Sequence, residues 1–135
     1  MKRHGQRVAG FSMIELLLVL VILGVLVGIV VTRFTGRGEQ ARVTAARADI
    51  RSLETALDAF EIDNGRFPTT QEGLEALVER PSNAPNWNRY LSRGVPTDPW
   101  GNPYVYEYPG RYNDDGYDLY SEGPEGGDGE RIGNW

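Results

Sequence analysis

The chain has 135 residues, which is enough for one small domain together with a membrane anchor. Its formal net charge of -5 argues against nucleic acid as a partner. It has no cysteine and its one histidine is His4, so disulfides and thiol chemistry are excluded, and we expect the protein not to be an enzyme.

The N-terminus combines a basic leader with a long apolar segment. Residues 1–10 contain three Lys or Arg side chains, whereas residues 11–31 contain a single charged residue, Glu15. As a helix rising ~1.5 Å per residue, the apolar segment would be roughly 30 Å long, which is enough to span a bilayer core. The basic leader favours a cytoplasmic N-terminus and an exported remainder. An ordinary signal peptide fits less well, because the apolar run is too long and no cleavage site of small residues follows it.

Glu15 is the residue that a simple anchor does not explain. A carboxylate inside an apolar segment costs about 2–3 kcal/mol and normally has a partner. If the chain is cut after Gly10, Phe11 acquires a positively charged amino terminus about one helical turn from Glu15. In a polymer, Glu15 of one subunit can then neutralise the new amine of its neighbour and set the axial register. The alternative is an anchor in which Glu15 lies at the level of the lipid headgroups.

Helical periodicity continues beyond the apolar segment but becomes one-sided. Over residues 32–63 the apolar side chains recur on one face of a helix. These face residues are Val43, Ala46, Ile50, Leu53, Leu57 and Phe60. We predict a single helix from about residue 11 to about residue 63, whose first half packs on lipid or other subunits and whose second half packs on its own domain. Gly36 and Gly38 lie between the halves and are expected to loosen the helix locally.

The long helix is followed by signals for a turn and a second helix. Asn64-Gly65 ends the long helix, because glycine can take the left-handed cap position. Thr69 and Glu72 have the spacing of a capping box. This box predicts a short helix over residues 70–78.

The C-terminal third is predicted to contain strands and a loop. Residues 104–108 and 117–121 are typical of two short strands separated by a polar turn. Residues 122–135 contain five glycines and are predicted to form a loop. An aromatic cluster is expected to supply core rather than a binding surface. Its members are Trp100, Tyr104, Tyr106, Tyr117, Tyr120 and Trp135.

Two sets of motifs resemble a known family. Gly10-Phe11, with Glu15 and an unbroken apolar helix behind it, resembles the N-terminal signal of type IV prepilins and type II secretion pseudopilins. Further blocks resemble the major pseudopilin of type II secretion, the G subunit. These blocks lie at residues 53–58, 63–70, 73–78, 98–104 and 132–135. The resemblance implies an α+β, pilin-like fold, in which a long N-terminal helix packs on a small domain with a short helix and a short antiparallel sheet.

The resemblance also implies how the chain is divided. Residues 1–10 would be a cleaved leader, and residues 11–31 a transmembrane helix that becomes the filament core. Residues 32–63 would be the amphipathic continuation of that helix. Residues 64–135 would be a globular periplasmic region that ends in an acidic, glycine-rich loop.

Processing and assembly are the functions that the resemblance implies. In the family, a prepilin peptidase cuts after the glycine, here Gly10, and methylates the new N-terminal residue, here Phe11. Cleavage would remove three positive charges and leave a mature net charge of -8. The implied product is the structural subunit of a pseudopilus, a periplasmic homopolymer that drives protein export across the outer membrane. Implied partners are the prepilin peptidase, minor pseudopilins and an inner-membrane assembly platform, and the chain would cross the bacterial inner membrane once with its N-terminus cytoplasmic.

The C-terminal loop is a candidate calcium site. Spaced carboxylates and exposed carbonyls on a flexible loop suit a hard cation that binds six to eight oxygens, and a solvated acidic loop is the alternative. The resemblance implies a calcium site here, with Glu125 and Glu130 carried over as ligands. Asp128 is a nearby carboxylate that we add as a candidate ligand. Arg131 departs from the family pattern, which has a second carboxylate at this position.

Other functions share some of these features. A type IV pilin or a minor pseudopilin would have the same N-terminus. A monomeric membrane-tethered periplasmic binding domain would need neither cleavage nor Glu15. An exported hydrolase is disfavoured, because the sequence has no histidine outside the leader and its aromatic residues fit a core.

Overall fold

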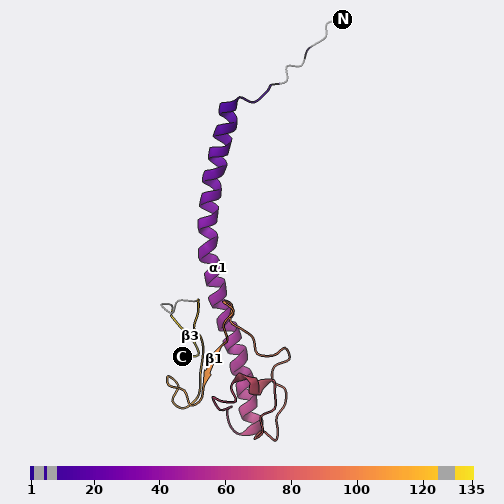
Figure 1. The fold of residues 1–135 in the computed structure, drawn as a ribbon, viewed down its shortest axis with the longest axis vertical. Coiled ribbons are helices and arrows are strands. Elements are labelled where there is room, and N and C mark those ends of the chain that lie inside the picture. Colours follow the sequence, from indigo (N-terminus) through magenta and orange to yellow (C-terminus); the bar gives the residue numbers. More distant parts are fainter. Residues whose placement is uncertain (2–4, 6–8, 125–129) are drawn as a thin grey trace. The chain divides into compact units, whose positions relative to one another are not determined.

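The computed structural model describes residues 1, 5, 9–124 and 130–135, except for the side chains of 31–35. The chain divides into two compact units, residues 1–38 and 39–135. In chain order the elements are one long helix, a short 3-10 helix and three strands, of which α1, β1 and β3 are labelled in Figure 1. The predicted α+β composition is therefore observed.

The long helix α1 runs from Met13 to Asn64. Ser12 is its N-cap: the Ser12 carbonyl accepts the backbone N–H groups of Glu15 and Leu16, and its Oγ accepts the N–H of Glu15 at 3.3 Å. The helix therefore begins two residues later than predicted. It continues without a break through Gly36 and Gly38, so the expected loosening does not interrupt the helix there.

The helix ends as its sequence predicts. Gly65 has a φ of 72°, in the left-handed region. Its N–H donates to the carbonyl of Glu61 at 2.7 Å, which satisfies one of the free carbonyls at the helix end.

The predicted apolar face of α1 forms the centre of the core. Ala46, Ile50, Leu53, Leu57 and Phe60 are all buried, and Val43 is partly buried against them. The rest of the domain packs on this face through residues in, or directly before, the 3-10 helix and the strands. They are Leu74, Ala76, Leu77, Tyr104, Tyr106, Tyr117, Leu119 and Ile132. The prediction that the second half of the helix packs on its own domain is confirmed.

The second helix is shorter than predicted. Both bonds of the capping box are present, from the Thr69 N–H to Glu72 at 2.8 Å and from the Glu72 N–H to the Thr69 hydroxyl at 3.2 Å. Gly73 then takes a φ of 60° and a ψ of -163°, which no α-helix contains. The box therefore opens a turn, and only the single 3-10 turn η1, Leu74–Leu77, follows it.

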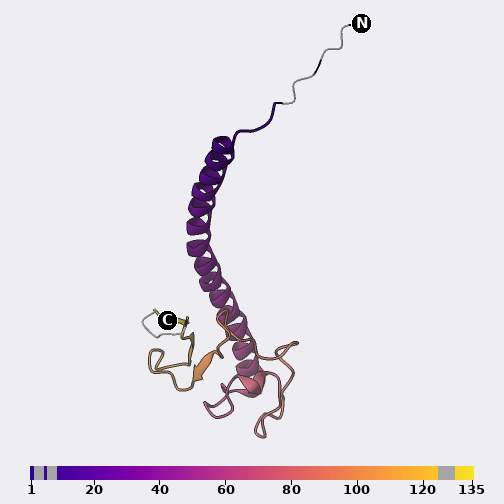
Figure 2. The same ribbon diagram turned by 45° about the horizontal axis from the view of Figure 1, so that its top comes forward.

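The sheet has three antiparallel strands in the order β1-β2-β3. β1 is Val105–Glu107, β2 is Asp118–Ser121 and β3 is Ile132–Gly133. The sheet and the C-terminal tail lie together on one side of the second half of α1, as two views show (Figure 1, Figure 2). β3 falls inside the segment predicted as a loop. It is a strand because it pairs with Tyr120 and Ser121 of β2. This pairing is a tertiary contact, and the sequence of residues 132–133 contains no periodic pattern that predicts it.

Candidate functional site

The predicted cleavage junction lies outside regular structure. Residues 9–12 belong to no helix or strand and are exposed, and Phe11 is 77% exposed. The Ser12 cap starts the helix just beyond the Gly10–Phe11 bond. The bond that the motif predicts to be cut is therefore held in an open, non-helical segment.

Glu15 lies in the first turn of α1. This position is favourable for a carboxylate, because the free N–H groups at a helix N-terminus carry a partial positive charge. Among the described residues, Glu15 forms no ion pair within its own chain. Its carboxylate is exposed and remains available to a partner from outside the chain.

The first half of α1 is an uncovered apolar helix. One 18-residue stretch, Met13–Val30, has a mean hydropathy of 3.0 with none of it buried, and among the described residues it is the one helix long and apolar enough to cross a membrane. Its Leu, Ile and Val side chains are about half exposed or more. Full burial of such a side chain is worth about 1.5–3 kcal/mol, so the bare helix in water would be strongly disfavoured.

The start of the acidic loop is tied to the turn before β1. Asp98 is buried, and its Oδ1 accepts the N–H groups of Trp100 and Asn102 at 3.1 and 2.8 Å. Its Oδ2 accepts the Ser121 hydroxyl at 2.6 Å, and that hydroxyl oxygen accepts the N–H of Gly123 at 3.1 Å. One buried carboxylate thus connects two distant segments and sets where the loop leaves β2.

The other end of the loop is held by the C-terminal tail. Asn134 bonds to the backbone of β2 in two ways: its backbone N–H donates to the Leu119 carbonyl at 3.1 Å, and its side-chain Oδ1 accepts the Leu119 N–H at 3.0 Å. Its Nδ2 donates to the Tyr117 carbonyl at 3.1 Å. The Trp135 ring then stacks on Tyr112, with centroids 4.3 Å apart and planes 15° apart. The tail thereby fastens β3 and the loop between β1 and β2 to each other.

The loop between β1 and β2 is organised around Asp118. This carboxylate is almost fully buried and accepts the backbone N–H groups of Arg111, Tyr112 and Asn113 at 2.6–3.3 Å. Burial raises the pKa of Asp118, but the bonds from these three N–H groups outweigh burial and hold the pKa below its ordinary value. Gly110 is required beside it, since an added Cβ would lie 2.6 Å from Asp118 Oδ1.

Most of the predicted aromatic core is confirmed. Tyr104, Tyr106, Tyr117 and Tyr120 are buried, and Trp100 is partly buried against the core. Trp135 is the exception: 48% of it is exposed. Its ring stacks on Tyr112, which is itself exposed, and meets the Tyr120 ring edge-on.

The candidate calcium ligands are only partly within the described residues. Glu125 and Asp128 lie outside them, whereas Glu130 is described and exposed. The described residues contain no group of three or more His, Cys, Asp or Glu side chains placed to hold a metal. Arg131 directs its guanidinium over the Tyr120 ring, 5.0 Å from the centroid. The calcium site therefore stays a prediction.

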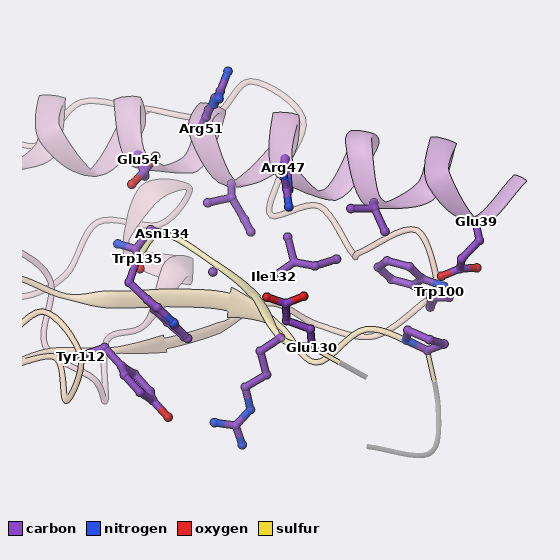
Figure 3. A pocket seen from close by; sticks show the side chains of 15 residues that line it. Glu39, Arg47, Arg51, Glu54, Trp100, Tyr112, Glu130, Ile132, Asn134 and Trp135 are labelled. Carbon is purple, nitrogen blue, oxygen red and sulfur yellow. The ribbon is translucent and has the colours of Figure 1, made fainter. Parts of the chain in front are cut away.

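An open groove of about 970 Å³ lies between α1 and the C-terminal tail. Glu39, Arg47 and Glu54 line it from the helix, and Glu130 and Asn134 line it from the tail (Figure 3). Its lining mixes guanidinium and carboxylate groups and contains no histidine or serine among the described residues.

Comparison with known proteins assigns the family. The family described as type II secretion system (T2SS), protein G, matches residues 33–135, and a prokaryotic N-terminal methylation motif matches residues 5–31. The chain belongs to the protein G family of type II secretion. It is 46% identical to the type II secretion system core protein G of Pseudomonas aeruginosa, over 100% of this chain and 99% of that protein. The corresponding core protein G of Escherichia coli K12 is 45% identical, over 98% of this chain and 94% of that protein.

A solved structure supports the same conclusion. The crystal structure of the major pseudopilin from the type 2 secretion system of enterohaemorrhagic Escherichia coli matches with a TM-score of 0.65 and 38% identity, covering 75% of this chain and 92% of that one. The predicted family and the pilin-like α+β fold are confirmed. The chain is grouped with structural pseudopilin subunits, and the methylation motif spans Gly10, Phe11 and Glu15.

Three residues that position the loops were not predicted. Asp98 and Asp118 accept backbone N–H groups a few residues away, and Asp98 also accepts the hydroxyl of Ser121. Asn134 bonds to the backbone of Leu119 and Tyr117, which are distant in sequence. For Asp98 the dense turn signal of residues 98–103 could have suggested a capping carboxylate. No comparable signal precedes Asp118, because its partners are fixed only when β2 pairs with β1.

Proposed function

We propose that this chain is the major structural subunit of a type II secretion pseudopilus, a periplasmic filament that drives protein export across the outer membrane. In this proposal the precursor is cut between Gly10 and Phe11, and the new Phe11 amine is methylated. The observation that carries the proposal is the uncovered apolar helix that begins directly after this junction, with Glu15 in its first turn. Such a helix needs either lipid or other copies of itself around it.

Leaving the membrane for the filament requires a specific contact. Lipid tails are as apolar as leucine side chains, so apolar contact alone gives helices little reason to leave lipid for each other. A carboxylate inside the apolar segment changes this balance, because it is costly in lipid and is satisfied beside a positive charge. In the filament, Glu15 of one copy pairs with the Phe11 amine of its neighbour and thereby sets the axial register.

Replacement of Glu15 tests the assembly mechanism. In a Glu15→Val chain the cleavage junction is intact, so leader removal is expected to proceed as in the wild type. Filament assembly is expected to fall sharply, because the Phe11 amine loses its partner. The measurement is the ratio of mature to precursor chain beside the fraction of protein that sediments as filaments. Normal assembly of Glu15→Val would overturn the charge-pair mechanism.

The topology and partners follow from the same helix. We place the N-terminus in the cytoplasm and the domain of residues 39–135 in the periplasm, with one crossing of the bacterial inner membrane. The basic leader supports this orientation. Prepilin peptidase would act on the junction, and minor pseudopilins and the inner-membrane assembly platform would contact the assembled copies. A structural role is supported by the similar solved protein, which is a major pseudopilin.

A structural calcium ion in the C-terminal loop is part of the proposal. The donor set fits a hard cation, since Glu125, Asp128 and Glu130 supply carboxylate oxygens. Both ends of the loop are fastened, at Ser121 and at Ile132, so a bound ion would order only the segment between them. Thermal melting of the full chain with calcium and with chelator tests this proposal. A higher melting temperature with calcium is expected, and identical melting curves would contradict a calcium site.

A further inference from the structure

Directly after the apolar stretch, α1 continues into a short segment whose charged residues are all positive. Residues 31–38 contain two arginines, Arg33 and Arg37, and no acid. The backbone stays helical throughout this segment (Figure 1). The first acid after the segment is Glu39, and its carboxylate pairs with Arg42 at 3.6 Å. A local excess of positive charge therefore follows the end of the predicted membrane span.

The charge of Arg37 has no partner within the described part of the chain. Arg37 is exposed and takes part in none of the ion pairs found there. A Cβ added at Gly36 or at Gly38 would meet no atom within 4 Å, so the surface on both sides of Arg37 is open. A guanidinium in such a setting can donate two parallel N–H bonds to one phosphate group.

The position of Arg37 along α1 places it near the surface of a bilayer. Arg37 comes seven residues after Val30, the end of the apolar stretch, which is about 10.5 Å along the helix axis. The headgroup region extends about 5–8 Å beyond each side of the hydrocarbon core. Side chains on a helix lean toward its N-terminus, which is here the direction of the membrane. The guanidinium of Arg37 is therefore expected at the level of the lipid phosphates.

The domain that follows this segment has no net attraction for an anionic surface. Residues 39–135 hold nine arginines and no lysine against eighteen acids, a net charge of -9. Positive residues at the exported end of a span also oppose the orientation that the basic leader favours. Arg33 and Arg37 thus work against the topology, unless a negatively charged partner lies beside them on the exported side.

We propose that Arg37, together with the positive charge of Arg33 one turn before it, binds the phosphate groups of anionic phospholipids in the exported leaflet while the chain is in the membrane. This inference rests on the proposed function, since it needs the helix to span the bilayer with the domain on the exported side. Anionic lipid is the partner of opposite charge at this level of the bilayer, because residues 31–38 of a second copy offer no acid.

The absence of cysteine allows the lipids beside Arg37 to be measured directly. The full-length chain with Gly38→Cys carries one fluorophore and is reconstituted in phosphatidylcholine vesicles that contain a minor fraction of phosphatidylglycerol. Fluorescence quenching is compared for phosphatidylglycerol and phosphatidylcholine that each carry a nitroxide near the top of the acyl chain. The labelled parent is expected to prefer phosphatidylglycerol, and Arg37→Gln on the same background is expected to lower this preference about fivefold. High salt is expected to lower the preference of the parent.

A matched control separates the segment from net charge. Arg51 is exposed on α1 fourteen residues after Arg37, so Arg51→Gln makes the same charge change beyond the segment. This control is expected to keep the preference of the parent, and the basic leader is present in every variant. An undiminished preference in Arg37→Gln, or an equal loss in Arg51→Gln, would contradict the lipid contact. Absence of quenching by either lipid would show that the helix is not inserted, which would contradict the proposed topology and this inference with it.

Discussion

Asp118→Asn should strongly destabilise the domain of residues 39–135. The Asp118 carboxylate satisfies three backbone N–H groups, and both of its oxygens are used. An asparagine keeps one oxygen and turns its NH₂ group toward donors, which leaves at least one N–H group buried without an acceptor. At about 1–3 kcal/mol for such a group, and more when the lost acceptor is charged, we expect a loss of about 3 kcal/mol in the free energy of unfolding. At about 4–8 °C per kcal/mol, the melting temperature would fall by roughly 12 °C or more.

The pH dependence of this loss provides an independent check. Because the folded-state pKa of Asp118 lies below its ordinary value of 3.8, its contribution is complete above that value and disappears as the pH falls through the folded-state pKa. The difference in unfolding free energy between wild type and Asp118→Asn should therefore be constant near neutral pH and shrink in acid below about pH 4. The assay is denaturant unfolding of the full chain in detergent, with Asp114→Asn, an exposed carboxylate of the same loop, as the control. Equal stability of the two variants at pH 7 would refute the reasoning.

Two further changes test the C-terminal tail. Asn134→Ala removes the side-chain bonds to Leu119 and Tyr117 and should cost about 2–3 kcal/mol, measured as a lower denaturant midpoint with an unchanged slope; an unchanged midpoint would show that the tail does not hold β2. Trp135→Ala loses a half-exposed ring that contacts Tyr112 and Tyr120, so a smaller loss of about 1 kcal/mol is expected in the same assay. A loss as large as that of Asn134→Ala would contradict the division of roles between the two residues.

The sequence predicted those elements whose signals are local. The apolar segment, the one-sided periodicity over residues 43–60 and the Asn64-Gly65 end each depend on residues a few positions apart, and all three are present in α1. The capping box was also local and formed both of its bonds. Its helix is short because the conformation of Gly73 ends the turn, which the composition of the segment does not reveal.

The features that the sequence analysis did not predict have a different physical origin. β3 is a strand because Ser121 lies opposite Ile132. β3 has only two residues, and a segment this short contains no pattern that predicts such a pairing. Asp118 and Asn134 likewise act as acceptors and donors for backbone groups that reach them only after the sheet has formed. Trp135 was predicted to be core because it is aromatic, whereas its ring stacks on the exposed Tyr112 and stays about half exposed.

The central claim is that the charge of Glu15 turns an anchor into a filament subunit. Glu15→Gln tests it most directly, because glutamine keeps the shape of the side chain and removes only the charge, while Glu15→Asp keeps the charge. The measurement is the fraction of mature chain that sediments as filaments, with all variants compared at equal levels of leader cleavage. The account predicts that Glu15→Gln loses most of its filaments and that Glu15→Asp retains more of them. Wild-type assembly by Glu15→Gln would contradict it.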